Sequence, residues 1–521
     1  MSNLIAFTVL IPVLTAVAVT PFENRRELQR RIAIVGGVLL LGLGLGLLAL
    51  TANGDILVLP LGRWSPLVGI VWVVDLLSAI LLALAALTSL ATLFYAPGGM
   101  RDERETRLFY LLHQLLLVGI NGSFVTGDFF NLFVMFEIML LSSFVLISLG
   151  ARARQLNQTF PYVLVNLVAS ALFLGGIGAV YGTAGTVNMA ELGQRVAAGG
   201  LPAAFWASLA LVLFVFAVKA ALLPLFFWLP DSYPQSPIPV NALFAGLLTK
   251  VGIYTLFRSV PLVTGSVPTG FHTLLIFLAA GTMLIGMLGA LGRPTIRGIL
   301  SFQIVSSVGY IIFGLAIYTP VALGAAIFYT VHSIVVTTAL FFAGGLAERV
   351  GGTDSLGSVR GMARTHPWVA VGFFIPAVAL AGLPPFSGFW GKLFLLIGGF
   401  GAGAYAATTI ALFVGLLTLG AMLKIWTSAF WGAPEGQKQP RLGHDRAMVG
   451  ATLTLASLSV VIGLAAGPLW RLSERTAVQL LAVTPYVEAV LTVDAVGMEA
   501  LETALPAVAP AGLALEHGGI R

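Results

Sequence analysis

The sequence predicts an all-α membrane protein whose chain crosses the bilayer fourteen times. Its composition is the first reason: 58% of the residues are hydrophobic and 9% are charged, whereas a soluble domain carries roughly 25% charged residues. The second reason is the length of the apolar runs, which match the roughly 20 residues that a helix needs to cross a membrane. The third is that short polar loops rich in arginine separate these runs.

The apolar runs give the positions of the spans. The first run follows Met1 without a basic segment or a cleavage site, and we expect it to remain as the first helix. After Arg471 the chain is less apolar, which indicates an interfacial helix followed by a loose tail. The expected spans are 3–21, 32–51, 68–95, 107–126, 129–149, 161–182, 204–223, 238–258, 270–292, 297–317, 321–346, 367–382 continuing through 386–401, 404–430 and 447–468.

The basic residues of the loops predict the orientation. With fourteen spans, the odd-numbered loops hold 17 lysines and arginines, and the even-numbered loops hold only Arg63, Arg195 and Arg258. Loops rich in positive charge remain in the cytoplasm. We therefore expect a multi-pass protein of the cell membrane with both termini outside.

Prolines interrupt the seventh and twelfth spans. Pro224 divides the seventh, and Pro384 and Pro385 divide the twelfth. Proline breaks a helix, and such a break at membrane depth requires protein or water around the freed carbonyls. Broken helices in corresponding places favour two inverted five-helix repeats, made of spans 4–8 and 9–13. The predicted division is 1–106 for three helices, 107–259 and 260–431 for the repeats, and 432–521 for the last helix and the tail.

Four of the five lysines lie inside apolar runs: Lys219, Lys250, Lys392 and Lys424. A charged amine at the bilayer centre costs about 3 kcal/mol or more, so it is expected to face a protein or aqueous interior and to have a function there. A buried lysine can lose its proton, whereas arginine keeps its charge. Lys219, Lys250 and Lys392 therefore predict a proton path. Lys424 lies nearer a helix end, where snorkelling to the interface explains it as well as a relay does.

Glu137 and His332 are two titratable candidates in the middle of spans. Glu137 is either a neutral acid bonded to a neighbouring serine or a carboxylate paired with a buried lysine. His332 is either a proton relay or a hydrogen-bonded packing residue.

The remaining candidates are peripheral or uncharged. Ser306, Thr337 and Thr338 either hold relay waters or bond their own helix backbone. His113 is either a relay on the inner side or a packing residue, and Asp75 is either a residue of the outer mouth or an acid at a helix end.

Several classes of chemistry lack their residues. The chain has no cysteine, so disulfides and thiolate metal sites are excluded. It has no phosphate-binding loop, no dinucleotide motif and no histidines at metal-binding spacing. The basic residues form no patch with interleaved aromatics of the kind that binds nucleic acid. We expect no cofactor, no resident metal and no enzymatic reaction.

Four motifs resemble a known family. They are KAALLPLFFWLPDSYPQSPIPVNALFAGLLTKVGIY at 219–254, RGILSFQIVSSVGYI at 297–311, LAGLPPFSGFWGK at 380–392 and KIWTSAFW at 424–431. The chain resembles the proton-translocating antiporter-like membrane subunits, which include subunits of respiratory complex I and of Mrp-type cation/proton antiporters. The single fourteen-helix unit and the TPYVEAVL ending at 484–491 favour the D-type branch of the Mrp antiporters.

The resemblance implies residue roles. Glu137 and Lys219 would form a pair on the fifth and seventh helices, Lys250 would be the central lysine, and Lys392 the terminal lysine. His332 falls where many relatives carry a histidine. The departures are Phe226 and Tyr233 in place of histidines and Thr337 in place of a lysine, so water held by Thr337, Thr338 and His332 would have to complete the path.

The resemblance also implies the function. The chain would move protons along a midplane axis of glutamate, lysine, histidine and water, coupled to Na⁺ or another monovalent cation in a multisubunit antiporter of a bacterial cell membrane. Its partners would be a large A-type protein of the antiporter complex and small membrane subunits. The alternative is a proton-pumping membrane subunit of a complex I-like or hydrogenase-linked oxidoreductase.

Overall fold

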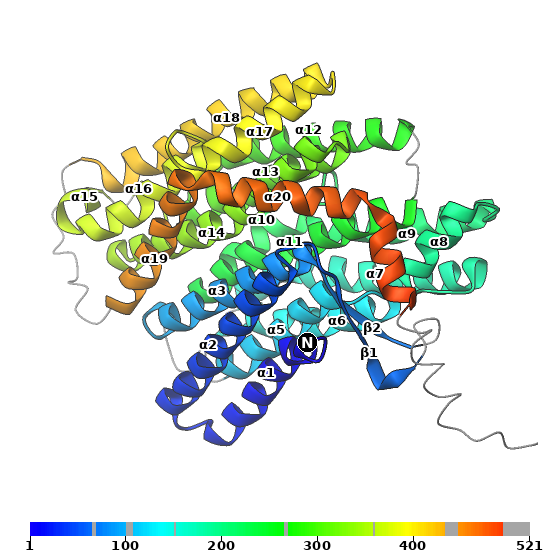
Figure 1. Cartoon of the computed structure of the whole chain (residues 1–521). Coiled ribbons are helices and arrows are strands. Elements are labelled where there is room, and N and C mark those ends of the chain that lie inside the picture. The colour runs from blue at the N-terminus through cyan, green and yellow to red at the C-terminus, as the bar shows by residue number, and fades with distance from the viewer. Residues whose placement is uncertain are drawn as a thin grey trace, which may run out of the picture.

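The computed structural model describes residues 1–64, 69–100, 108–150, 153–264, 269–357, 360–432 and 446–492. Arg101, Arg104, Arg107, Arg152, Lys438 and Arg441, which contribute to the predicted orientation, and the tail from residue 493 onward lie outside these residues. Within them the chain is a bundle of long helices with one short β-hairpin (Figure 1).

Four successive groups of elements lie along the chain, and the predicted division into domains stays a prediction. The N-terminal group is α1 (Leu4–Val19), α2 (Arg26–Thr51), β1 (Leu57–Pro60), β2 (Val71–Val74) and α3 (Leu76–Gly99). The second is α5 (Phe109–Val125), α6 (Phe129–Ile147), α7 (Ala153–Ala184), α8 (Met189–Ala198), α9 (Ala203–Ala220), α10 (Trp228–Ser232) and α11 (Ile238–Thr264). The third is α12 (Thr269–Gly292), α13 (Ile296–Ile317), α14 (Pro320–Gly351), α15 (Met362–Thr365), α16 (Pro367–Ala381), α17 (Ser387–Gly401) and α18 (Tyr405–Ile425). The last is α19 (Arg446–Leu464) and α20 (Ala466–Leu481), followed by a helix at 483–492.

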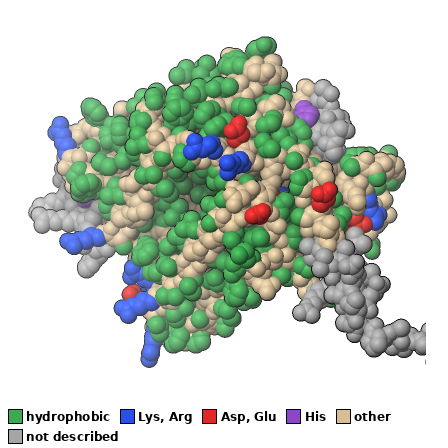
Figure 2. Space-filling model, in the orientation of Figure 1, with side chains coloured by type: hydrophobic (Ala, Val, Ile, Leu, Met, Phe, Trp, Pro, Cys, Tyr) green, Lys and Arg blue, Asp and Glu red, His purple; other side chains and the backbone are tan. Residues whose placement is uncertain are grey.

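Apolar helices dominate the described part of the chain. It contains 12 helices long and apolar enough to cross a membrane, and the shorter apolar helices α5 and α16 coincide with two further predicted spans. Every expected span therefore has a helix at its position, although the count of fourteen crossings stays a prediction. Figure 2 shows the corresponding surface, which is largely hydrophobic, with few charged side chains.

The β-hairpin corrects the expected start of the third span. The sequence predicted a helix from residue 68, but Val71–Val74 form β2, which pairs antiparallel with β1. The run VWVV is apolar enough to extend a hydropathy window, yet its branched and aromatic residues favour a strand. The helix begins only after Asp75, whose side chain accepts a hydrogen bond from the Ser78 amide at 3.0 Å.

Both predicted breaks are present, and their helix ends have the same geometry. At the end of α9, Ala221 has a φ of 61° and the Leu222 amide bonds the Ala217 carbonyl at 3.0 Å. At the end of α16, Gly382 has a φ of 87° and the Leu383 amide bonds the Val378 carbonyl at 3.3 Å. A left-handed residue with this longer bond is a common helix C-cap. The fourth helix of each predicted repeat therefore ends in the same way.

The interior of the bundle is made by α3, α11, α13 and α14. All residues in the most apolar windows of α11 and α14 are buried, against 94% in α13, 89% in α3 and 33% in α2. The surrounding helices shield these four from lipid. This shielding permits polar side chains at membrane depth in the centre of the bundle.

A buried ion pair joins α3 to α11. Both guanidinium ends of Arg258 bond the Asp75 carboxylate, at 2.6 and 2.7 Å, and the two side chains are at most 4% exposed. The Arg258 guanidinium also lies 4.8 Å from the Tyr486 ring of the helix at 483–492. Arg258 was expected in a loop, but α11 continues to Thr264. The acid at the helix end thus caps α3 and fastens it to α11 and the C-terminal segment.

We expect the Arg258→Met variant to lose about 3–5 kcal/mol of unfolding free energy, because it leaves the Asp75 carboxylate buried without its cation. The measurement is denaturant unfolding of the full-length chain in detergent. The matched variant is Asp75→Asn combined with Arg258→Met, which keeps a capping side chain and removes both charges. It should lose clearly less, and an equal or larger loss would contradict a desolvated ion pair.

Candidate functional site

Lys250 lies at the centre of the bundle on α11. Its side chain is fully buried, and its ammonium donates to the Ala245 carbonyl at 3.1 Å. Ammonium carries three donors, and this is its one hydrogen bond among the described residues. The prediction that this lysine faces an interior away from lipid agrees with its position.

His332 on α14 is fully buried. Its Nδ1 atom is 2.8 Å from the Ser387 hydroxyl on α17. The charges of Lys392 and Lys250 both act on its ring. Gly388 makes this approach possible, because a Cβ atom there would lie 2.8 Å from His332 Cε1 and 1.9 Å from the Ala379 carbonyl oxygen. The helix break thus brings α17 against the histidine.

Lys392 contacts the break between α16 and α17. Its ammonium donates to the carbonyl of Ala381, the last residue of α16, at 3.2 Å and lies 5.1 Å from the Tyr310 ring centre. A cavity of about 210 Å³ adjoins it, lined by Tyr310, Gly382 and residues of α17 and α18. Lys392 therefore contacts a backbone carbonyl at the helix break.

Polar atoms without protein partners cluster on the same central helices. Within the described part of the chain, the hydroxyls of Thr249, Ser333 and Thr337 and the Nε2 atom of His332 are buried with no hydrogen-bond partner. Each such atom costs free energy unless it is bonded. Water is the natural partner, and buried water typically bonds two to four polar groups. The cluster therefore supports a hydrated passage between α11 and α14.

Three of the lesser candidates already have partners. Thr338 donates to the Ile334 carbonyl of its own helix at 2.8 Å, and Ser306 donates to the Met283 carbonyl at 3.0 Å. His113 is buried with its Nε2 atom 3.3 Å from the Ser89 hydroxyl. The contacts of Thr338 and His113 fit their structural alternatives, whereas Ser306 bonds the neighbouring helix α12 and not its own backbone.

Lys219 and Glu137 approach each other without touching. The Lys219 ammonium lies 3.2 Å from the Asn166 amide oxygen and 3.4 Å from the Ser170 hydroxyl, both on α7. The Glu137 charge acts on Lys219, but no ion pair within 4.0 Å joins the two. One Glu137 oxygen is buried without a partner, and the side chain as a whole is half-buried.

Lys424 caps the C-terminus of α12. Its ammonium donates to the Leu291 carbonyl at 2.7 Å and to the Arg293 carbonyl at 2.8 Å, at the C-terminus of α12. A cation is favourable there because the last carbonyls lack partners within the helix. This geometry resembles the snorkelling alternative, and it leaves Lys424 apart from the central polar cluster.

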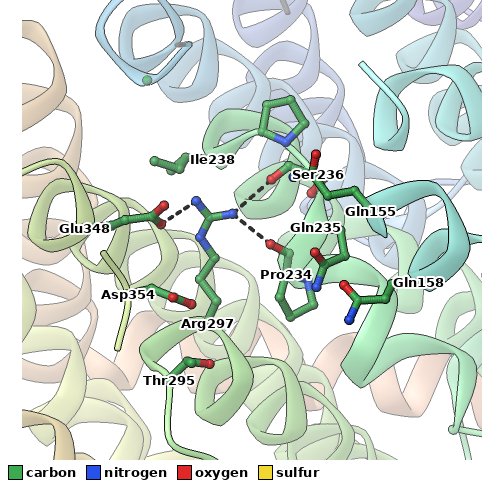
Figure 3. Close-up of a pocket in the computed structure, with 12 residues that line it drawn as sticks. Gln155, Gln158, Pro234, Gln235, Ser236, Ile238, Thr295, Arg297, Glu348 and Asp354 are labelled. Carbon is green, nitrogen blue, oxygen red and sulfur yellow. Dashed lines mark hydrogen bonds and ion pairs between the residues drawn. The ribbon is translucent and has the colours of Figure 1, made fainter. Parts of the chain in front are cut away.

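A polar pocket that the sequence analysis did not identify lies where several loops meet (Figure 3). It has a volume of about 390 Å³. Arg297 forms an ion pair with Glu348 and donates to the Pro234 and Ser236 carbonyls at 2.8 and 3.0 Å. Burial, and then the Glu348 charge, raise the pKa of Asp354 on its edge. In the sequence, Arg297 is the first residue of the motif RGILSFQIVSSVGYI at 297–311. We used it only as one of the basic loop residues that predict the orientation.

The site contains no group of ligands for a metal. Among the described residues, no three side chains of histidine, cysteine, aspartate or glutamate lie close enough together to hold one. The clustered groups are amines, hydroxyls and one imidazole. Such groups can bind and pass protons through water.

Comparisons with known proteins show the family and the fold of the chain. Residues 126–418 match the family described as "NADH:quinone oxidoreductase/Mrp antiporter, TM". The D-type Na(+)/H(+) antiporter subunit from Alkalihalophilus pseudofirmus is 41% identical over 94% of this chain and 100% of its own. A chain of the Mrp complex from Dietzia sp. has a TM-score of 0.88 and 34% identity, covering 94% of this chain and all of its own. A chain of respiratory complex I from Thermus thermophilus has a TM-score of 0.78 and 25% identity, covering 91% and 99%.

We expect Gly388→Ala to destabilise the chain by about 1–3 kcal/mol, because its new methyl group would clash first with the Ala379 carbonyl of α16 and then with the His332 ring on α14. The measurement is the unfolding free energy of the full-length chain in detergent. Gly401→Ala is the matched control on the same helix, since a Cβ atom there meets nothing within 4 Å. Equal stability of the two variants would show that α17 does not pack closely against α16 and α14 at Gly388.

Proposed function

Because the chain belongs to the family of NADH:quinone oxidoreductase/Mrp antiporter membrane subunits, we propose that it is the proton-translocating, D-type subunit of a multisubunit Na⁺/H⁺ antiporter. The observation that carries the proposal is the row of buried amines and imidazole, Lys250, His332 and Lys392, beside hydroxyls that lack protein partners. Protons pass along this row through bound water. No covalent chemistry occurs in the chain.

Lys219 and Glu137 control the charge at the start of the row. Neutral oxygens of Asn166 and Ser170 hold the Lys219 ammonium, while Glu137 lies half-buried on α6. A neighbouring protein of the complex that packs on α6 would desolvate this carboxylate and shift it toward or away from the lysine. At an effective dielectric of about 20, closing the pair to 4 Å contributes about 4 kcal/mol, enough to bind or release a proton.

The polar pocket around Arg297 serves as the mouth of the row on the side of the odd-numbered loops, which the positive-inside rule assigns to the cytoplasm. Its polar lining admits water. Asn241 lies one turn along α11 from Ile238, which lines the pocket, and it is buried with neither amide atom bonded to a described residue. Both termini then lie outside, and Na⁺ moves with the help of partner subunits.

One observation favours a second candidate. The chain from complex I shares the fold over 91% of this chain, so a proton-pumping subunit of a complex I-like oxidoreductase remains the alternative. The two are separated by what copurifies with the protein under gentle conditions. Iron–sulfur subunits would favour the oxidoreductase, and only membrane subunits would favour the antiporter.

We expect Lys250→Met to abolish sodium-driven proton exchange, because it removes the central protonatable group from the row. The assay is the dissipation of a pH gradient on Na⁺ addition in everted vesicles that carry the assembled complex, with assembly checked by copurification. Lys424→Met is the matched control, since Lys424 bonds only carbonyls at the end of α12 among the described residues. It should retain most of the exchange. Full exchange with Lys250→Met would overturn the proposed role.

We expect Glu137→Gln to reduce exchange strongly in the same vesicles, because the neutral amide cannot change the charge balance at Lys219. Glu474→Gln on α20 is the control for loss of one carboxylate elsewhere, and it should behave as the unmodified complex. If Glu137→Gln exchanges as fast as that control, Glu137 has no part in proton transfer.

A further inference from the structure

An apolar groove opens between the first turns of α16 and α19, away from the row of buried amines. Its volume is about 500 Å³. Val369, Val449 and Leu453 form its walls, and Arg446, His366 and Trp368 lie at its open end. Figure 1 shows α15, α16 and the beginning of α19 at the same end of the bundle. The groove therefore has one cationic end and one apolar end.

The groove closes about two turns inside the protein. A Cβ atom on Gly372 would lie 3.0 Å from Thr452 Cγ2, so α16 and α19 are in close contact there. Leu453 lies seven residues beyond Arg446, about 10 Å along the helix axis. This depth accommodates a glycerol backbone and the first part of an acyl chain, but not a protein helix with side chains.

The charges at the open end select an anion. The Arg446 guanidinium lines the groove and makes no hydrogen bond or ion pair with any described residue. His366 lies beside it, with Nδ1 3.0 Å from the Thr365 hydroxyl. The helix α16 begins here, so its positive dipole end adds to the field. The described lining residues include no aspartate or glutamate.

The position relative to the membrane indicates a lipid. Trp368 is 65% exposed at the start of α16, and tryptophan at a helix end marks the headgroup level of a bilayer. Below it the exposed wall is apolar. Basic pockets between transmembrane helices bind anionic headgroups. The change from cationic to apolar along the helix axes matches the change along a phospholipid.

We propose that the groove between α16 and α19 is a binding site for one anionic phospholipid, whose phosphate contacts Arg446 and whose acyl chain lies against Val449 and Leu453. The site lies between the second predicted repeat, which contributes α16, and the last helix α19, and it depends on no step of the proposed proton transfer. Phosphatidylglycerol is the probe.

The test measures phosphatidylglycerol retained by the full-length chain from mixed micelles, by native mass spectrometry, with phosphatidylcholine as the neutral reference. Arg446→Gln should weaken retention about tenfold, since it removes one charge-assisted hydrogen bond. Arg364→Gln, a nearby arginine that does not line the groove, should retain the lipid. Equal loss in both variants, or equal retention of the two lipids by the unmodified chain, would overturn the proposal.

A second variant tests the apolar half. Gly450 lines the groove, and a Cβ atom there meets nothing within 4 Å, so Gly450→Leu fills the groove without disturbing packing. It should block phosphatidylglycerol, whereas Gly420→Leu, at another open position on α18, should not. Displacement of the lipid by inorganic phosphate alone, or unchanged retention by Gly450→Leu, would show that the groove holds only a phosphate-sized anion or nothing, and would overturn the lipid assignment.

Discussion

The structure depends on one constraint: lysine amines are buried inside a membrane protein, and no carboxylate of the described residues contacts them. Lys219, Lys250 and Lys392 are all buried, and none forms an ion pair with a described residue. Their partners are carbonyl, amide and hydroxyl oxygens. Such partners hold an ammonium only weakly, because a neutral oxygen returns less of the desolvation cost than a carboxylate does. A weakly held proton is one that can leave.

The rest of the fold follows from this constraint. Four helices form an interior without lipid contact, and the break between α16 and α17 supplies the Ala381 carbonyl to Lys392. The buried pair of Arg258 with Asp75 resists such exchange, and it ties the start of α3 to α11. Arginine serves there because it keeps its charge, and lysine serves in the interior because it need not.

The sequence determined the class, the helix positions and the breaks, because apolar length and proline act locally. The wrong predictions concern properties that depend on three-dimensional packing, which the order of the residues does not show directly. Hydropathy cannot separate the strand Val71–Val74 from a helix start, and an assumed span of about 20 residues ended α11 too early, so Arg258 was counted in a loop. The partner of Lys219 depended on helix rotation, and Asn166 gave no signal because single polar residues are common in membrane helices.

The separation of Glu137 from Lys219 is informative about coupling. A permanent pair at 4 Å would be held by about 4 kcal/mol at an effective dielectric of about 20, and the lysine could then release its proton only rarely. In the structure neutral oxygens hold Lys219, and Glu137 lies half-buried on α6 with one oxygen unbonded to the described residues. Such a carboxylate responds to whatever covers α6. Contact with a partner would therefore change proton affinity at the start of the row without moving the lysine, which is how a protein that carries protons can respond to a neighbour that handles another ion.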